Sequence, residues 1–387
     1  MKQKECGEMI YFDNSATTQV EDSVLETFMK VSQKMNGNPS SLHQLGDMAD
    51  GLLQQSRKQI ASIMGVQEAE IYFTSSGTEG DNWAIKGTAI EKMRYGKHLI
   101  TTSIEHPAVK ESMVQLEQLG FEVTYLPVDE KGIISVSDLK EAIRPDTILV
   151  SIMAVNNEVG SIQPIEEVGE VLREYPTIHF HVDAVQAVGK VPLDLSSASR
   201  IDLATFSGHK FHGLKGTGFL YIKHGRVIAP LLNGGGQEKG RRSGTENVAG
   251  IAAMARALRL LFDQQKQKIA AQIQIRDYMM DELEKYSKVQ IYSTKQGAPH
   301  IVCFALSGIR GEVSVHAFEK EEIFISTTSA CSSRSKTSSS TLAAMNVASR
   351  MATGAVRISL TDTSTLEEAK QFLSSFDKLY QNFKNIK

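Results

Sequence analysis

The sequence has 387 residues, of which 41% are hydrophobic and 22% charged, which is typical of a globular protein with room for a large domain and a smaller one. Because 42 Lys and Arg face 45 Asp and Glu, the net charge of -3 argues against direct binding to nucleic acid or to an anionic membrane. The first nine residues lack an apolar run and no later stretch is long enough to span a bilayer, so we expect a cytoplasmic protein.

Short runs rich in β-branched and aromatic residues alternate with helical stretches in the first part of the chain. In chain order they are residues 71–74, 98–103, 122–128, 147–153, 178–182, 202–206 and 218–222. Helices are expected between them, for example over 107–119 and 164–174, each opening with proline. This alternation predicts an α/β fold with a mostly parallel sheet of about seven strands, whose functional residues collect at the carboxyl ends of the strands.

The remaining sequence predicts a smaller α+β domain. Apolar residues at helical spacing over 248–283 predict one long connector helix. Further strands are expected over 300–306, 323–327 and 355–360. The segment 326–341, dominated by Ser and Thr around Cys331, predicts a mobile loop.

These elements predict three parts of the chain. Residues 1–20 form an amino-terminal arm that contributes to the small domain, and residues 21–250 form the large, cofactor-binding domain. Residues 251–387 supply the connector helix and the small carboxyl-terminal domain with the cysteine loop.

Lys210 ends the run TFSGHK, just past a predicted strand. An amine that is desolvated in such a place can lose its proton and bond a cofactor aldehyde. A lone lysine is more often a solvated surface residue. The motifs around Lys210 favour the role of a Schiff-base lysine.

Asp183 and Gln186 leave another strand end, three residues apart in HVDAVQ. A carboxylate such as Asp183 can keep a pyridinium nitrogen protonated, so that the ring accepts electrons from the substrate. Gln186 can donate to a phenolic oxygen of the same ring. The alternative is that Asp183 caps the following helix.

The segment TSSGTEGDN, residues 74–82, follows a strand and opens a helix. Its Gly77 and Thr78 predict a phosphate site, because amides at the amino end of a helix favour a dianion. Ser207 and His209 could complete this site. Simple helix capping is the competing interpretation.

His106 precedes a proline-started helix at a further strand end. Its imidazole could stack on an aromatic cofactor and move protons, or it could cap the helix. Two histidine pairs, at 179/181 and 209/212, have spacings that suit a metal, but no third ligand is evident. We predict no metal site.

The three cysteines are far apart and include no CxxC pair, so neither a disulfide framework nor a cysteine zinc site is predicted. Cys303 lies in an apolar strand and is interpreted as packing, and Cys6 as incidental. Cys331 lies in a polar loop with Arg334 and Lys336 nearby, which favours a reactive thiolate.

Several motifs in fixed order resemble the group I cysteine desulfurases, the NifS/IscS-like family of fold-type I pyridoxal-phosphate (PLP) enzymes. They are YFDNSATT, GNPSS, TSSGTEGDN, EHPAV, VNNEVG, HVDAVQAVGK, SGHKFHG, RRSGTEN, SAC and VRISL, and they cover nearly the whole chain. The resemblance implies a homodimer that removes sulfur from L-cysteine, releases L-alanine and carries the sulfur as a persulfide on Cys331.

The resemblance also implies a role for each site residue. Lys210 is the Schiff-base lysine and the base, and His106 stacks on the PLP ring and helps in proton transfer. Asp183 binds the ring nitrogen, and Gln186 and Asn157 lie at the phenolic oxygen. The phosphate is held by Gly77, Thr78, Ser207 and His209, with Thr245 from the other subunit, and the substrate carboxylate by Asn38 and Arg357. A planar guanidinium such as that of Arg357 also suits a carboxylate on chemical grounds.

Other interpretations stay open at this point. Another PLP enzyme of this fold, such as an aminotransferase or a selenocysteine lyase, would not need Cys331, and a sulfur-carrier scaffold would not turn over. The acceptor could be an iron–sulfur scaffold, a tRNA-thiolation enzyme or a carrier in thiamine synthesis. The chain departs from the family pattern at Leu214, at residues 338–341, and at Thr361 and Asp362, which replace a glycine and an arginine.

Overall fold

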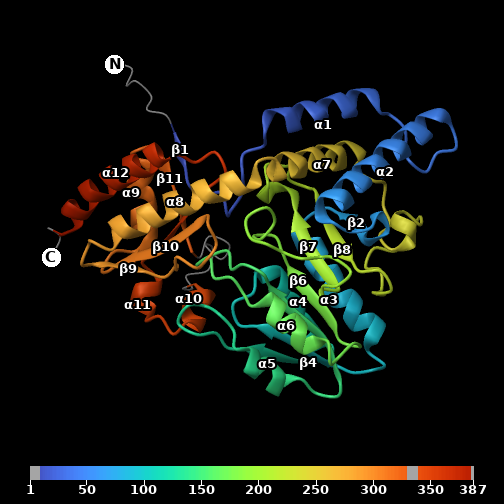
Figure 1. Cartoon of the computed structure of the whole chain (residues 1–387), viewed down its shortest axis with the longest axis horizontal. Coiled ribbons are helices and arrows are strands. Elements are labelled where there is room, and N and C mark those ends of the chain that lie inside the picture. The colour runs from blue at the N-terminus through green and yellow to red at the C-terminus, as the bar shows by residue number, and fades with distance from the viewer. Residues whose placement is uncertain (1–8, 329–338, 385–387) are drawn as a thin grey trace.

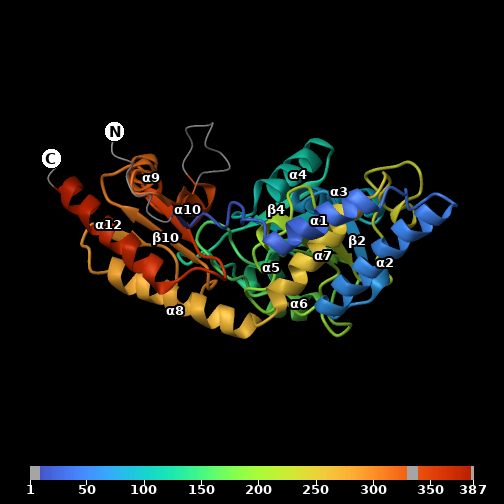
Figure 2. The same cartoon turned by 90° about the horizontal axis from the view of Figure 1, so that it is seen from above.

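The computed structural model describes residues 9–328 and 339–384. Two lobes lie side by side along the long axis of the molecule, one around a seven-stranded sheet and the other around a four-stranded sheet (Figures 1 and 2). None of the helices in these described ranges is long and apolar enough to cross a bilayer.

The larger sheet confirms the predicted mostly parallel, seven-stranded arrangement. Its strands are β2 (Ile71–Thr74), β3 (His98–Thr102), β4 (Glu122–Leu126), β5 (Thr147–Met153), β6 (His179–Asp183), β7 (Leu203–Ser207) and β8 (Gly218–Ile222). They lie in the order β2-β8-β7-β6-β5-β3-β4. Only β8 runs antiparallel to its neighbours, β2 and β7.

Helices cover both faces of this sheet, which explains why strands such as β5 are apolar along their whole length. Apolar side chains of α3 (Gly77–Lys92) and α4 (Pro107–Gln118) pack on one face. The other face is covered by α5 (Val136–Ala142), α6 (Ile165–Leu172) and α7 (Val248–Phe262), and α2 (Gln44–Met64) and α1 (Asp22–Lys34) pack outside α7. Pro164 caps α6 rather than occupying its first turn as predicted.

The smaller lobe is built on an antiparallel sheet in the order β12-β13-β10-β9. The strands are β9 (Val289–Ile291), β10 (Ile301–Leu306), β12 (Ser326–Thr327) and β13 (Ala355–Ser359). Helices α9 (Gly311–Glu319) and α12 (Leu366–Lys384) cover it with stacked rings of Phe318, Phe372 and Phe376. The amino-terminal strand β1 (Ile10–Tyr11) pairs with β11 (Ile323–Phe324), as expected for an arm that joins this lobe. The predicted domain boundaries stay predictions.

The prediction of one long connector helix is wrong. Helix α7 ends at Phe262, and α8 (Gln265–Leu283) begins after a break in which Gln264 has a left-handed backbone with φ 54°. The apolar period continues through the break because both helices bury one face. However, Leu258 of α7 packs into the core of the larger sheet, whereas Met279 of α8 packs into that of the smaller sheet.

The predicted loop over 326–341 has ordered ends. Ser326 and Thr327 pair with β13, and Ser339 caps α10 (Ser340–Ala344), which is followed by α11 (Ser349–Ala352). Small hydroxyl residues therefore serve here as an edge strand and as a helix cap. Cys331 lies outside the described residues.

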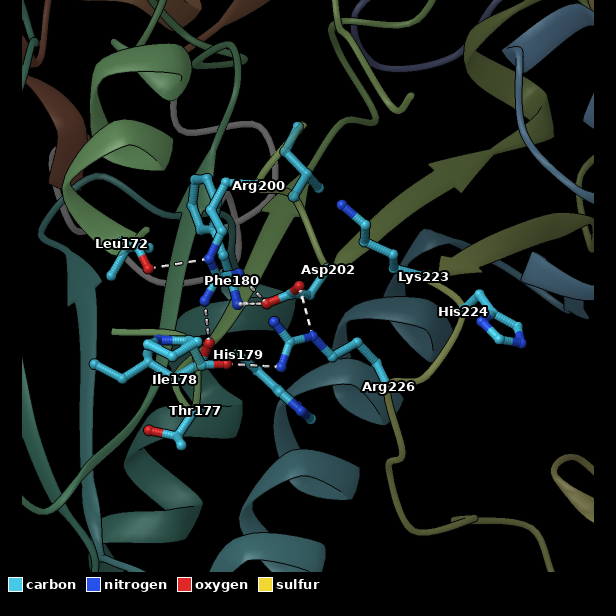
Figure 3. A network of polar contacts seen from close by, with 12 residues as sticks. Leu172, Thr177, Ile178, His179, Phe180, Arg200, Asp202, Lys223, His224 and Arg226 are labelled. Carbon is cyan, nitrogen blue, oxygen red and sulfur yellow. Dashed lines mark hydrogen bonds and ion pairs between the residues drawn. The ribbon is translucent and has the colours of Figure 1, made fainter. Parts of the chain in front are cut away.

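A buried carboxylate fixes the amino-terminal end of β7 (Figure 3). Asp202 accepts from Arg200, from Arg226 at 2.7 Å and from the Phe180 amide at 2.9 Å. Arg200 also donates to the carbonyls of Leu172 and Ile178, which ties the start of β7 to the end of α6 and to the start of β6. This network fixes the start of the strand whose other end carries Ser207 and Lys210.

Candidate active site

Lys210 lies at the carboxyl end of β7, on a single 3-10 turn, Gly208–Lys210. Its Nζ donates to the carbonyl oxygens of Ser15 at 2.5 Å and of Ala16 at 2.9 Å, both on the amino-terminal arm. Its charge acts to lower the pKa of His106 and of His209. The amine therefore lies where the sequence places it, amid groups from several strand ends.

Asp183 is the last residue of the neighbouring strand β6 and is only 6% exposed. Its Oδ1 accepts from the Val185 amide at 3.0 Å. The chain turns here without starting a helix, so the helix-capping alternative does not apply. Burial raises the pKa of Asp183, while the charges of His106 and Lys210 and the Val185 amide act to lower it. A cationic ring nitrogen is the kind of partner that would offset this burial.

His106 caps α4, since its Nδ1 accepts from the Ala108 amide at 3.1 Å. The capping alternative is thus correct, but it uses only Nδ1 and fixes the orientation of the ring. Burial lowers the pKa of His106; the charge of Asp183 opposes this effect and that of Lys210 adds to it. The imidazole can cap the helix and still offer its face to a planar ligand.

The amino end of α3 lies against the carboxyl end of β7. A Cβ on Gly77 would be 2.9 Å from Val185 Cγ2 and 3.2 Å from Ser207 Cβ, so a larger residue would push the helix away. Thr78 is exposed in the first turn. Burial, together with the charge of Lys210, lowers the pKa of His209 to about 4, and its Nδ1 lies 3.2 Å from Thr17 Oγ1. The first-turn amides of α3 beside Ser207 and the neutral imidazole of His209 are each able to donate to an anion.

Gln186 and Asn157 have other contacts in this structure. Gln186 Nε2 donates to the Ser15 carbonyl at 3.1 Å, and its Oε1 lies 3.3 Å from His300 Nε2. The backbone carbonyl of Asn157 accepts from Arg357 at 2.9 Å. Asn157, a predicted cofactor residue, is therefore hydrogen-bonded to Arg357, the predicted substrate residue.

Arg357 lies on β13, and its side chain is only 4% exposed. Its Nη2 is paired with Asp13 Oδ1 at 2.7 Å. Its Nε is buried and makes no hydrogen bond within the described residues. The guanidinium is thus anchored, with donor capacity left for a carboxylate.

The structure does not bring Asn38 or Thr245 to these groups within one chain. Asn38 is exposed in the loop between α1 and α2, at the end of the molecule opposite the smaller lobe (Figure 1). Thr245 is also exposed. Both roles stay predictions, and that of Thr245 was predicted for the site of the other subunit.

Sequence reasoning missed the contribution of the amino-terminal arm. Asp13 binds Arg357, and the Ser15 carbonyl accepts from both Lys210 and Gln186. Thr18 Oγ1 donates to the His209 carbonyl at 3.0 Å. The motif YFDNSATT marks this segment in the sequence, but part of its contribution is made by backbone carbonyls that accept hydrogen bonds. Residue types do not reveal such contacts.

The residues present fit PLP. Gly77 lets the amide-rich amino end of α3 pack closely against Ser207, where its amides can bind a phosphate, and Asp183 offers a buried carboxylate for a ring nitrogen. Lys210 offers an amine for an aldehyde, and the orphaned Nε of Arg357 can donate to a substrate carboxylate. These donors and acceptors match the polar ends of that cofactor.

Comparison with known proteins agrees with this geometry. A protein of Lactobacillus delbrueckii subsp. bulgaricus, described as a NifS/IcsS protein homolog, is 54% identical over 98% of this chain and 99% of its own. The cysteine desulfurase IscS of Methanosarcina thermophila is 43% identical over 97% of this chain and 93% of its own.

Solved structures give the same result. A NifS-like protein superposes with a TM-score of 0.91 at 38% identity, over 97% of this chain and 100% of its own. A structure described as SspA in complex with cysteine has a TM-score of 0.79 at 35% identity, over 91% of this chain and 98% of its own. The aminotransferase class-V family matches residues 10–372. The chain belongs to the aminotransferase class-V family.

Proposed function

We propose that this protein is a PLP-dependent cysteine desulfurase, which converts L-cysteine to L-alanine and keeps the sulfur as a persulfide on Cys331. The observation that carries the proposal is that Lys210 and Asp183 follow the neighbouring strands β7 and β6, while Gly77 packs the amino end of α3 against Ser207 at the end of β7. Relatives over nearly the full length of the chain are described as cysteine desulfurases, and the family is PLP-dependent.

When bound, PLP supplies an aldehyde for amines and a ring that accepts electrons. The amides of the first turn of α3, with Ser207 and His209, hold the phosphate in this proposal. Asp183 keeps a proton on the ring nitrogen. Lys210 removes the α proton of the substrate with its amine once that amine is free, and Arg357 binds the substrate carboxylate.

Cys331 completes the reaction in this proposal. Its thiolate forms a bond to the sulfur of the substrate while the carbon–sulfur bond of the substrate breaks. The carbon takes up a proton and leaves as alanine, and the sulfur stays on the protein. Cysteine and one thiol thus give alanine and one persulfide, with no outside oxidant.

We also propose a cytoplasmic homodimer in which Asn38 and Thr245 reach the site of the other subunit. Both residues are exposed in the single chain, which supports this assignment. A protein acceptor, either an iron–sulfur scaffold or a tRNA-thiolation enzyme, would take the persulfide.

The test is alanine release from L-cysteine in the presence of a thiol reductant. Cys331→Ala should keep the visible absorbance of the bound cofactor and lose desulfurisation. Cys303→Ala is the matched control, because Cys303 is fully buried in β10 and burial raises the pKa of its thiol. If Cys331→Ala turned over normally, an aminotransferase or lyase would replace the proposal; if the wild type released no alanine, the site would be that of a scaffold.

A further inference from the structure

Three segments that are far apart in the sequence meet behind Lys210. They are the loop after Lys210 with His212, the end of β13 with Thr361 and Asp362, and the first turns of α8 with Lys268. Their side chains line a small cavity that Lys210 also lines. Thr361 and Asp362 are two of the residues at which the chain departs from the pattern of the family it resembles.

Asp362 binds a histidine and a lysine from the other two segments. Its Oδ1 lies 2.9 Å from His212 Nε2, and its Oδ2 lies 3.1 Å from Lys268 Nζ. Thr361 Oγ1 lies 2.8 Å from the same His212 nitrogen and donates to Asp362 Oδ1 at 3.1 Å. Burial would raise the pKa of Asp362, but the hydrogen bonds and charges of His212 and Lys268 outweigh it and hold that pKa well below its usual range.

His212 is fixed on its other sides by the amino-terminal arm. Its Nδ1 lies 2.9 Å from the Gln19 carbonyl, and its amide donates to Thr18 Oγ1 at 2.8 Å. Its carbonyl accepts from the Glu21 amide at 3.2 Å. The backbone of His212 has φ 63°, a left-handed conformation that a residue with a Cβ adopts only when its surroundings enforce it.

The same arm binds the catalytic lysine. Thr18, which bonds His212, also bonds the carbonyl of His209, and Ser15 and Ala16 accept from Lys210 Nζ. A movement of His212 would therefore be transmitted to Lys210 through two routes, the loop itself and the arm. Arg357 lies on the strand that ends just before Asp362, so the carboxylate of Asp362 joins the two halves of the site.

We infer that His212 and Asp362, closed by Lys268, form a clamp that positions Lys210 relative to Arg357 across the two lobes. His212 and Asp362 are positioning residues, since neither contacts the reacting atoms. The inference rests on the proposed function for the roles of Lys210 and Arg357. It predicts that loosening the clamp slows the steps that Lys210 performs more than it weakens the binding of substrate.

The test uses His212→Asn, which tolerates the left-handed backbone, Asp362→Asn and the double variant, all as full-length protein. Four quantities are measured: kcat for L-cysteine, KM for L-cysteine, the rate at which the cofactor-free protein takes up PLP, and the rate at which borohydride traps PLP on Lys210. The control is Glu319→Gln, which breaks an exposed pair with His316 of similar length, 3.0 Å.

We expect each single variant to lower kcat and both PLP rates about tenfold, while KM changes less than threefold. The double variant should lower kcat and both PLP rates by no more than either single variant does. Additive losses, or a lower melting temperature with unchanged rates, would show that the pair only stabilises the fold and would overturn the inference. If a single variant does not fold, Thr361→Val removes one hydroxyl of the clamp and should cost about threefold in the same rates; unchanged rates would again overturn it. PLP uptake and trapping do not require desulfurisation. An inactive wild type would therefore refute the proposed function, whereas the clamp would still be tested by the rates of PLP uptake and trapping.

Discussion

Lys190 is a buried amine beside Lys210, and replacing it with methionine should stabilise the protein in a pH-dependent way. Lys190 is 7% exposed and lines the same cavity as Lys210 and Asp362. Burial lowers the pKa of Lys190 from 10.5 to about 7; the charge of Lys210 adds to this effect and that of Asp362 opposes it.

The magnitude follows from the two protonation equilibria. The pKa values of Lys190 in the unfolded and folded chain, 10.5 and about 7, differ by about 3.5, which corresponds to a penalty of about 5 kcal/mol at low pH. Between pH 7 and pH 10.5 the unfolded chain binds more protons at this site, so the free energy of unfolding of the wild type rises with pH. Lys190→Met does not titrate. Its advantage over the wild type should therefore shrink by about 2 kcal/mol from pH 7 to pH 9.

The assay is urea unfolding of the cofactor-free proteins at pH 7, 8 and 9, followed by the fluorescence of Trp83, the single tryptophan, which is 1% exposed. Groups that titrate in both proteins change both free energies of unfolding equally, so their effect cancels in the difference between variant and wild type. Lys131→Met, at an exposed position, is the control and should show a difference that does not change with pH. A constant difference for Lys190→Met as well would refute the idea that Lys190 is buried without a compensating partner.

Three further predictions concern the site itself. Gly77→Ala should weaken PLP binding at least tenfold in a titration, because its Cβ would meet Val185 Cγ2 at 2.9 Å, whereas Gly51→Ala, with nothing within 4 Å, should bind normally. Burial raises the pKa of Glu105 to about 8, so the stability of the wild type should fall as pH rises from 4.5 to 8, and the advantage of Glu105→Gln in urea unfolding should grow by about 2.5 kcal/mol from pH 5.5 to 7.5. Arg357→Lys should raise KM for L-cysteine about tenfold with a smaller change in kcat, since a lysine cannot offer paired donors, and an equal loss in kcat would contradict this.

The sequence predicted the larger sheet well because each of its strands is a short apolar run, bounded by turns and buried on both sides. It also placed Lys210, Asp183 and Gly77 correctly at strand ends, because parallel strands bring their carboxyl ends to one edge. The break between α7 and α8 could not be predicted, since Gln264 is a residue type that usually continues a helix. The break lets α7 and α8 bury their apolar faces in two different cores.

Contacts between segments that are far apart in the sequence could not be predicted either. His212 and Thr361 are 149 residues apart, and neither residue type suggests a partner. The capping role of His106 was one of two interpretations, and only the 3.1 Å contact with the Ala108 amide decides that it applies. The arm contributes backbone carbonyls, which every residue has, so composition could not single it out.

Three buried carboxyl groups, those of Asp81, Glu105 and Asp183, influence one another's pKa values, and the charges around them differ. Burial raises the pKa of Asp81 and of Glu105, and the charge of Asp183 raises both further. The charges that oppose burial at Asp183 are those of His106 and Lys210. Neighbouring positive charge opposes burial at Asp183 but not at Asp81 or Glu105, so Asp183 is the carboxyl group of the three that most favours its ionised form. The site would then present the carboxylate of Asp183 to a cationic ring nitrogen, and helix amides at its other end to a phosphate, which is the polarity that PLP requires.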